Sequence, residues 1–354
     1  MRLPERDAAA VVGAIVVVTL AIASATSAVR AMAPHHRAAL SRPPATERSA
    51  PDDDAALPPP PEPLAGLLAE HGYELPEGVS VYAAEVVAQA GGAGLRIRAF
   101  EGGAGAYGAS FWPASSIKVL VALGALDFLR GLGFSGGATI ESDDGWTETA
   151  RDLADAAIEE SSNEAYDMLV QIAGVEWLNT TFLTPAHGFP ETVIQRSYSG
   201  IDIRSSPEMT ITEGGRRQVV PARTSAADFG CPDNGNCSNL YEMARSVEQV
   251  VLDAKLPAGE RLELDPVDIR ALTGDLAATD TFIEPGVKRA LGNGAVVYGK
   301  SGWVSGLDCV DVGAISDLTT GRTYLLGVAS PDAGPGCDVL PDVAEQVLRA
   351  LDGA

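Results

Sequence analysis

The run from Ile117 to Leu129 constrains the fold most, because it is apolar almost all the way round. A helix with that pattern offers no face to solvent and is buried on every side. Pro113 lies just before the run and suits a helix start, since proline is tolerated in the first turn. We therefore expect a central helix that begins shortly after Pro113 and is enclosed by other elements.

Segments typical of strands lie toward both ends of the remaining chain. Val79–Val87 and Gly94–Phe100 are predicted to form a hairpin joined by a Gly-Gly-Ala-Gly turn. Periodicity predicts further strands at 295–300, 310–316 and 323–330, and helices at 149–173, 239–252 and 338–351. Strands at both ends with helices between them indicate an α+β fold, in which the two ends of the chain complete one antiparallel sheet.

The charge of the chain narrows the classes of partner. A net charge of −23 argues against nucleic-acid binding and against docking on anionic lipid. Its plainer interpretation is a solvated acidic surface. With 354 residues and 46% apolar content, the chain can bury a substantial core.

The N-terminal region has the composition of an export element followed by a spacer. Ala8–Val29 contains no charged residue and is long enough to span a bilayer, and it ends in small residues like a signal-peptidase site. Residues 30–63 are rich in Ala, Pro and charge, which predicts an extended tether. The expected division is a signal peptide or membrane anchor at 1–29, a linker at 30–63 and a folded domain at 64–354. Cleaved signal and retained anchor both remain open.

The number of cysteines is consistent with export. The four cysteines form an even set, which in an exported chain indicates two disulfides. Of the three pairings, Cys231–Cys237 with Cys309–Cys337 is the simplest topologically. The sequence has no C-x2-C ligand pair and no H-E-x-x-H, so we expect no metal site and no cofactor.

Three short motifs stand in order along the chain: Ser115-Ser116-Ile117-Lys118, Ser161-Ser162-Asn163 and Lys300-Ser301-Gly302. Each alone is weak, and the ordered set is much stronger. Only four of the 25 basic residues are lysines, and two of those four lie in the motifs. Lysine supplies a titratable amine, which arginine cannot.

The first motif could form a nucleophile and its base. Residues three apart share one face of a helix, so Ser115 and Lys118 should be neighbours. Serine needs a base beside it to act as a nucleophile, and burial of Lys118 would favour the neutral amine that can serve as one. The alternative is a lysine that merely caps the rim of an apolar helix.

The other two motifs could complete an acyl-transfer site. Ser161 can relay a proton, and Asn163 can hold a substrate amide; the alternative is a polar surface of a helix. On a strand, Lys300 adds positive charge, Ser301 can bind a substrate carboxylate, and Gly302 permits close approach; the alternative is a plain edge strand with a glycine kink. The backbone N–H groups of Ser115 and Trp303 would form an oxyanion hole.

The ordered motifs match those of serine acyl-transfer enzymes that recognise penicillin. From Gly78 to Leu351 the chain resembles the class A β-lactamase and penicillin-binding protein superfamily. Trp146–Ile158 resembles the helix that leads into S-x-N, and Arg223–Asp228 resembles the helix start after the active-site loop. The resemblance implies a sheet plus a helical subdomain, with the site in the cleft between them.

The resemblance also implies roles for the motif residues. Ser115 would be the acylated nucleophile, Lys118 the general base and Ser161 the proton shuttle, while Lys300 and Ser301 would bind the carboxylate. Class A β-lactamases carry a glutamate that activates the deacylating water. Here Ser206 stands in its place, and the nearby Glu208 is the candidate substitute.

The residue after the third motif is another departure. Trp303 replaces the small residue of the family and could reshape the cleft. With this change and the missing glutamate, we expect acylation rather than efficient lactam hydrolysis.

The sequence thus predicts an exported, monomeric serine hydrolase that acts on a β-lactam or related amide through Ser115. Two alternatives stay open. One is a D,D-carboxypeptidase or related amidase on cell-wall peptides. The other is a catalytically weak module that binds wall peptide or a partner protein. The expected substrate is a small molecule or a peptidoglycan peptide, with membrane contact only through the N-terminal segment.

Overall fold

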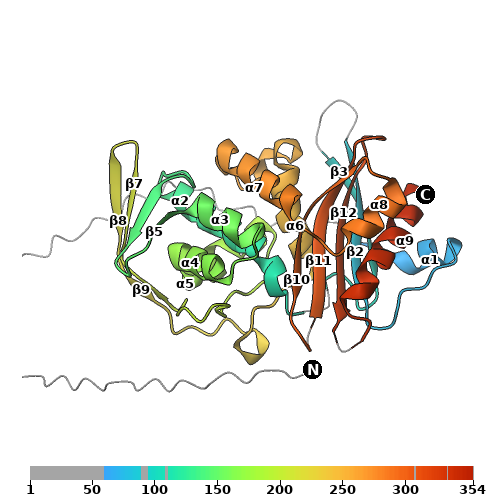
Figure 1. Cartoon of the computed structure of the whole chain (residues 1–354), viewed down its shortest axis with the longest axis horizontal. Coiled ribbons are helices and arrows are strands. Elements are labelled where there is room, and N and C mark those ends of the chain that lie inside the picture. Colours follow the sequence, from blue (N-terminus) through green and yellow to red (C-terminus); the bar gives the residue numbers. More distant parts are fainter. Residues whose placement is uncertain (1–59, 89–94, 108–110, 307, 333, 354) are drawn as a thin grey trace, which may run out of the picture. The chain divides into compact units, whose positions relative to one another are not determined.

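A six-stranded sheet forms one half of the fold (Figure 1). The computed structural model describes residues 60–88, 95–107, 111–306, 308–332 and 334–353. The strand order is β1-β3-β2-β12-β11-β10, antiparallel throughout except for the β1–β3 pair. The strands are β1 (Glu62–Pro63), β2 (Ser80–Ala88), β3 (Leu95–Gly102), β10 (Ala295–Trp303), β11 (Asp308–Asp317) and β12 (Thr323–Pro331). The prediction of one sheet built from both ends of the chain is confirmed, while the predicted turn at 91–94 and the predictions for 1–59 lie outside the described residues.

Three helices cover one face of this sheet: α1 (Leu64–Glu70), α8 (Glu284–Leu291) and α9 (Leu340–Asp352). In α9 the buried apolar residues recur at helical spacing, so one stripe faces the sheet. These are Leu340, Val343, Ala344, Val347, Leu348, Ala350 and Leu351. The stripe packs with side chains of the sheet into a core that belongs to this half alone.

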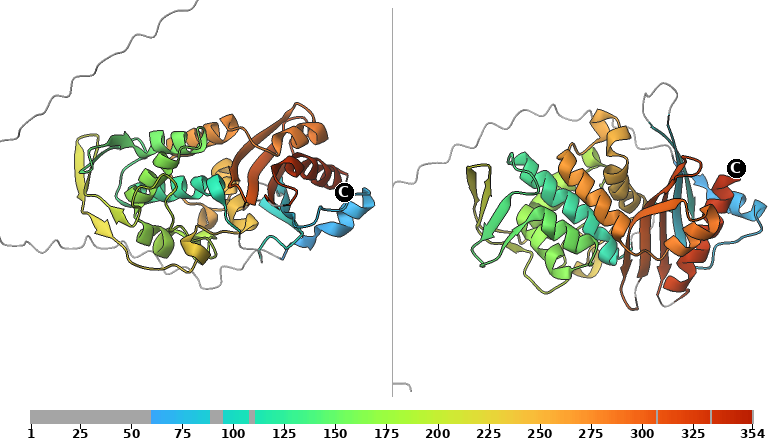
Figure 2. Two further views of the ribbon diagram at one scale, coloured as in Figure 1. Left: turned by 60° about the horizontal axis from the view of Figure 1, so that its bottom comes forward. Right: turned by 45° about the horizontal axis from the view of Figure 1, so that its top comes forward.

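The other face of the sheet meets a helical part (Figure 2). It contains α2 (Lys118–Gly131), α4 (Asn163–Ala173), α6 (Leu240–Val251), α7 (Pro266–Ala278) and α3 (Ala150–Ile158). The α2 side chains from Lys118 to Asp127 are buried on all sides, as the apolar run predicted. Helix α2 is therefore the centre of the larger core.

The single helical stretch predicted at 149–173 is wrong, because the structure has two helices there. Helix α3 ends at Ile158, and α4 begins at Asn163. The Ser162 hydroxyl accepts a hydrogen bond from Ala165 N and caps α4, which is a strong signal for a helix start. Ser161 has φ +56°, a left-handed conformation that no helix can contain. Ser161 therefore lies in the turn between α3 and α4 and not on the face of either helix.

The middle of the chain also contains strands that the sequence analysis missed. A second sheet has the order β5-β4-β7-β8, from β4 (Thr139–Ser142), β5 (Thr147–Thr149), β7 (Met209–Glu213) and β8 (Arg216–Val220). The turn between β7 and β8 is Gly214-Gly215, both with positive φ, a known hairpin signal. The helix predicted to include Trp146–Ile158 is thus preceded by β5 and starts only at Ala150.

The helix start expected at Arg223–Asp228 is also wrong. Arg223 and Thr224 form the short strand β9, which pairs with β6 (Ser205–Ser206), and the residues after it are irregular. The Arg223 guanidinium donates to the carbonyls of Gln171, Ile172 and Ala173. It thereby satisfies carbonyls at the end of α4, which have no partner within their own helix.

Two disulfides fasten the domain. Cys231 pairs with Cys237 across a short loop, with a Cα–Cα distance of 5.9 Å. Cys309 in β11 pairs with Cys337, with a Cα–Cα distance of 5.3 Å, and ties the sheet to the turn before α9. Within the described ranges, no helix is both long enough and apolar enough to cross a membrane.

Candidate active site

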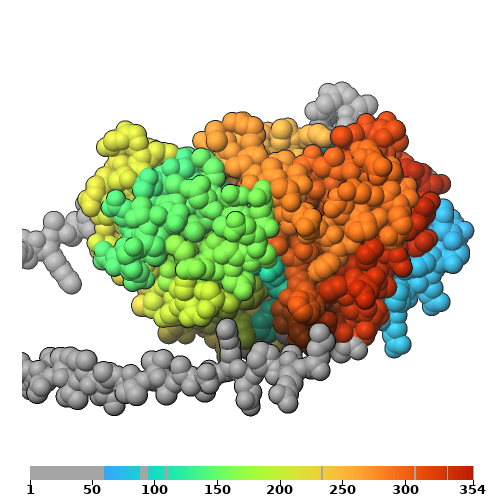
Figure 3. Space-filling view, in the orientation of Figure 1, coloured from blue at the N-terminus to red at the C-terminus, as the bar shows by residue number. Residues whose placement is uncertain are grey.

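A single 3-10 turn, η1 (Ala114–Ile117), presents Ser115 directly before α2. Ala114 has φ +47°, and its carbonyl accepts a hydrogen bond from the Tyr198 hydroxyl at 2.9 Å. The Ser116 hydroxyl donates back to the carbonyl of Pro113. These bonds fix the turn, so Ser115 lies just outside the helix rather than within its first turn. Figure 3 shows teal atoms of this segment at the seam between the helical part and the sheet part.

Lys118 contacts Ser115 and is fully buried. Its Nζ lies 3.0 Å from Ser115 Oγ, and its side chain is 0% exposed. Nζ also donates to Ser161 O and to Asn163 Oδ1, at 2.5 and 2.8 Å. Burial, assisted by the charge of Lys300, lowers the pKa of Lys118 to about 7. The neutral amine that a base requires is therefore well populated near neutral pH.

Ser161 bridges the two motif lysines. Its Oγ lies 3.2 Å from Lys118 Nζ and 3.1 Å from Lys300 Nζ. Lys300 is 2% exposed, and burial lowers its pKa to about 8, although the neighbouring Asp311 acts in the opposite direction. The chain Ser115–Lys118–Ser161–Lys300 is thus continuous at hydrogen-bond distance.

Asn163 and Ser301 both make hydrogen bonds within the protein. The Asn163 amide oxygen accepts from Lys118 Nζ, so this amide helps to hold the lysine amine in place. The Ser301 hydroxyl donates to the carbonyl of Asp280 at 3.3 Å, on β10 beside the site.

Gly302 brings β10 against the turn that carries Ser115. A Cβ placed on Gly302 would lie 2.6 Å from Pro113 O and 2.8 Å from Ser115 N, closer than real Cβ atoms come. Only glycine fits this approach. It places the edge strand of the sheet directly beside Ser115.

The backbone N–H of Trp303 is directed to the open edge of β10. Val304 N donates to Asp308 O, toward β11. Because successive N–H groups of a strand alternate in direction, the N–H of Trp303 points away from β11. The indole is 53% exposed and its Nε1 donates to Asp332 Oδ1 at 2.8 Å, so the ring lies on the rim of the site.

Glu208 is not brought to Ser115. It is exposed directly before β7, and its carbonyl accepts from Asp143 N at 3.0 Å, in the outer sheet. That sheet lies at the far end of the helical part from β10 (Figure 1).

Two residues that support the site were missed by the sequence analysis. Tyr198 holds η1 through Ala114, and its ring centroid lies 5.9 Å from Lys118 Nζ. Asp167, fully buried in α4, holds the Tyr198 segment by accepting from Tyr198 N at 2.9 Å and from both flanking serines. No motif marks either residue.

Asp311 is a third missed residue, and it had a sequence signal. It is the one charge within the apolar strand 309–315, where a fully buried carboxylate needs a partner. In the structure it is 0% exposed and accepts from Ile283 N at 3.0 Å. Burial raises its pKa to about 7, and it lies close enough to Lys300 to favour the charged amine.

Comparison with known proteins gives a consistent result. The model of the beta-lactamase enzyme family matches residues 132–349, more than half of the chain. The solved structure of PBP-A has a TM-score of 0.56 and 17% identity, covering 84% of this chain and 100% of its own. A mutant of PBP-A is solved as an acyl-enzyme complex with penicillin G.

Two β-lactamases are similar in fold to the same degree. The TLA-3 extended-spectrum beta-lactamase has a TM-score of 0.55 and 13% identity, covering 81% of this chain and 96% of its own. A class A beta-lactamase from Bacteroides cellulosilyticus has a TM-score of 0.54 and 14% identity, covering 82% of this chain and 99% of its own. No curated protein matches the sequence. These likenesses confirm the predicted fold.

Proposed function

Since this chain belongs to the beta-lactamase enzyme family and is a serine hydrolase, we propose that Ser115 forms an acyl-enzyme with a β-lactam or a related amide. One observation carries the proposal above all: Ser115 Oγ lies 3.0 Å from the buried Nζ of Lys118, whose pKa is lowered to about 7. A serine next to a neutral amine has the base that it needs. This geometry also argues against the open alternative of a module that only binds.

The proposed reaction uses the contacts in sequence. Neutral Lys118 takes the proton of Ser115 as Oγ attacks the substrate carbonyl. The N–H groups of Ser115 and Trp303 stabilise the oxyanion. Collapse breaks the C–N bond, and the leaving nitrogen takes a proton from Ser161 Oγ, which is replenished by Lys118. Lys300, with Ser301 beside it, attracts the substrate carboxylate.

A second candidate, a D,D-carboxypeptidase-type activity on cell-wall peptides, is favoured by the position of Glu208. Deacylation of a β-lactam adduct requires a base for the attacking water. Glu208 is exposed beside the outer sheet. Asp167, the carboxylate near Lys118, is already engaged by the Tyr198 segment. A penicillin adduct should therefore persist, as it does on peptidases that lactams inhibit.

Acylation should show a bell-shaped pH dependence. The neutral form of Lys118 is lost as the pH falls below about 7, because its pKa is lowered to that value. The positive charge of Lys300 is lost as the pH rises above about 8. The second-order rate of acylation by a fluorescent penicillin, measured across this range, should peak between the two. In a Lys300→Arg variant the alkaline limb should disappear, and a rate independent of pH in the native protein would contradict both roles.

Intact-mass spectrometry after incubation with penicillin G tests the central proposal. We expect a persistent adduct of one penicillin on the protein and none on the Ser115→Ala variant. Loss of the penicillin without an adduct, still dependent on Ser115, would instead identify an efficient lactamase. Neither adduct nor turnover, with penicillin or with a D-alanyl-D-alanine peptide, would overturn the proposal in favour of a binding module.

We also propose that the protein is exported, as a monomer, with residues 1–29 as signal or anchor, 30–63 as spacer and 64–354 as the hydrolase domain. The two disulfides support an extracellular or periplasmic location, since such bonds persist in oxidising compartments. N-terminal sequencing of the protein recovered from membrane and soluble fractions distinguishes cleavage from anchoring. Recovery of a reduced protein from the cytoplasm would contradict export.

A further inference from the structure

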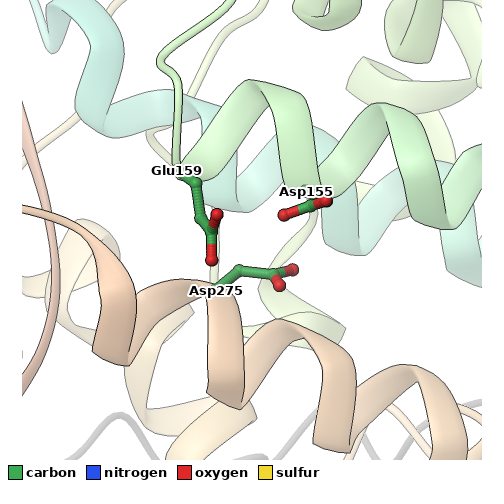
Figure 4. Close-up of side chains that lie close together, drawn as sticks. All are labelled: Asp155, Glu159 and Asp275. Atoms are coloured by element: carbon green, nitrogen blue, oxygen red, sulfur yellow. The ribbon is translucent and has the colours of Figure 1, made fainter.

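Three carboxylates meet between two helices behind the Ser161 turn. Asp155 and Glu159 project from α3, and Asp275 projects from α7. One oxygen of each lies within 4.8 Å of the others. Figure 4 shows the three carboxyl groups directed toward one another across the gap between the helices. The spacing of Asp155 and Glu159, four residues apart, places both on the same face of the helix.

Asp275 is the member of the cluster that indicates a ligand. Its side chain is only 9% exposed, yet its buried Oδ2 has no hydrogen-bond partner among the described residues. No ion pair in the described part of the chain involves any of the three carboxylates. A buried carboxylate beside two others is costly unless a cation or a proton neutralises it.

We propose that Asp155, Glu159 and Asp275 bind a calcium ion between α3 and α7. Carboxylate oxygens are the ligands that hard divalent cations prefer. Magnesium demands a near-ideal octahedral arrangement at about 2.0–2.1 Å and retains most of its water, whereas calcium binds at about 2.3–2.6 Å in irregular geometry. Side chains that come from two separate helices therefore suit calcium better. The site also lies at the C-terminal end of α3, where the helix dipole favours a cation.

The ion would brace the turn that carries Ser161. Glu159 is the residue at the end of α3, two positions before Ser161. The same helices already meet at Thr279, whose hydroxyl oxygen lies 2.8 Å from Asp275 O and 3.4 Å from Ile158 O. Calcium would add a second tie between α7 and the start of this turn. Calcium binding at this site does not depend on the proposed acylation of Ser115.

Thermal unfolding of the full-length protein in detergent, with calcium or with EDTA, tests the site. At about 10 mM CaCl₂, above the dissociation constants of about 10⁻⁴–10⁻³ M typical of extracellular calcium modules, the melting temperature should rise by about 3 to 8 °C. MgCl₂ at the same concentration should raise it less. Calorimetric titration should give one calcium ion per chain.

Single substitutions distinguish calcium binding at this site from non-specific calcium binding to the acidic surface of the protein. Asp275→Asn should abolish the calcium response and raise the melting temperature in EDTA, because it removes a buried like charge. Glu159→Gln, at an exposed position, should abolish the response even if the buried substitution impairs folding. Glu160→Gln, which removes the same charge outside the cluster, should respond like the native protein. Absence of a calcium response in the native protein, or equal responses in all variants, would overturn the proposal.

Discussion

Replacement of Lys118 by arginine should slow acylation of Ser115 by about 10²- to 10⁴-fold, the usual contribution of a general base. Arginine keeps the positive charge but does not deprotonate in proteins, so it removes the base and leaves the charge. The effect should be large because Lys118 Nζ lies 3.0 Å from the Ser115 hydroxyl, whose proton the base must take. The measurement is the second-order rate of acylation by a fluorescent penicillin.

Because Lys118 is fully buried, folding must be separated from chemistry. Near-ultraviolet circular dichroism and the melting temperature establish whether the Lys118→Arg protein is native. Lys118→Met, of similar length and neutral, provides a second variant without a base. If either variant folds and acylates at the native rate, Lys118 is not the base.

Replacement of Gly302 by alanine should damage both stability and acylation. Its Cβ would lie 2.6 Å from Pro113 O, 2.7 Å from Ser116 N and 2.8 Å from Ser115 N, all backbone atoms that cannot rotate away. Relief requires β10 to move from η1. Overpacking of this kind costs about 1–3 kcal/mol, which corresponds to a drop in melting temperature of about 3 to 9 °C. The same movement carries the Trp303 N–H away from Ser115, and loss of one oxyanion donor costs about 10²- to 10³-fold in rate.

Gly66→Ala is the matched control. Gly66 lies in α1, where an added Cβ meets nothing within 4 Å. Alanine is favoured over glycine in a helix, so this variant should be slightly more stable and fully active. Native acylation by the Gly302→Ala protein would show that the approach of β10 to η1 is not needed for the reaction.

The ends of the chain were the most predictable part of the fold. Strands such as β11 and β12 are long apolar runs, and α9 has an unbroken helical repeat, so local pattern and tertiary structure agree. The break between α3 and α4 was missed because apolar periodicity continues on both sides of it. The cap at Ser162 and the positive φ of Ser161 override that periodicity over a few residues. Similarly, β7 and β8 are short and polar, and only the Gly214-Gly215 turn marked them.

The candidate site was predictable where residues are close in sequence or carry a motif. The three-residue spacing of Ser115 and Lys118 predicts their contact, which the structure shows. The ordered motifs predict that Ser161 and Lys300 lie beside them, and both do. The support of the site could not be predicted in this way. Tyr198 and Asp167 act through hydrogen bonds to backbone groups distant in sequence, and such contacts leave no residue pattern.

The connectivity of the six-stranded sheet also governs when the site can exist during folding. Strand β2 pairs with β12, so Val86 lies opposite Thr323 although most of the chain separates them in sequence. Contacts between such distant segments form slowly, because a long loop must close before any pairing energy is gained. A growing or still extended chain carries Ser115 and Lys118 side by side but has no Lys300 beside Ser161 and no edge strand against η1. We therefore expect the surroundings of Ser115 to assemble late in folding, so that the proposed acylation would report completion of the sheet.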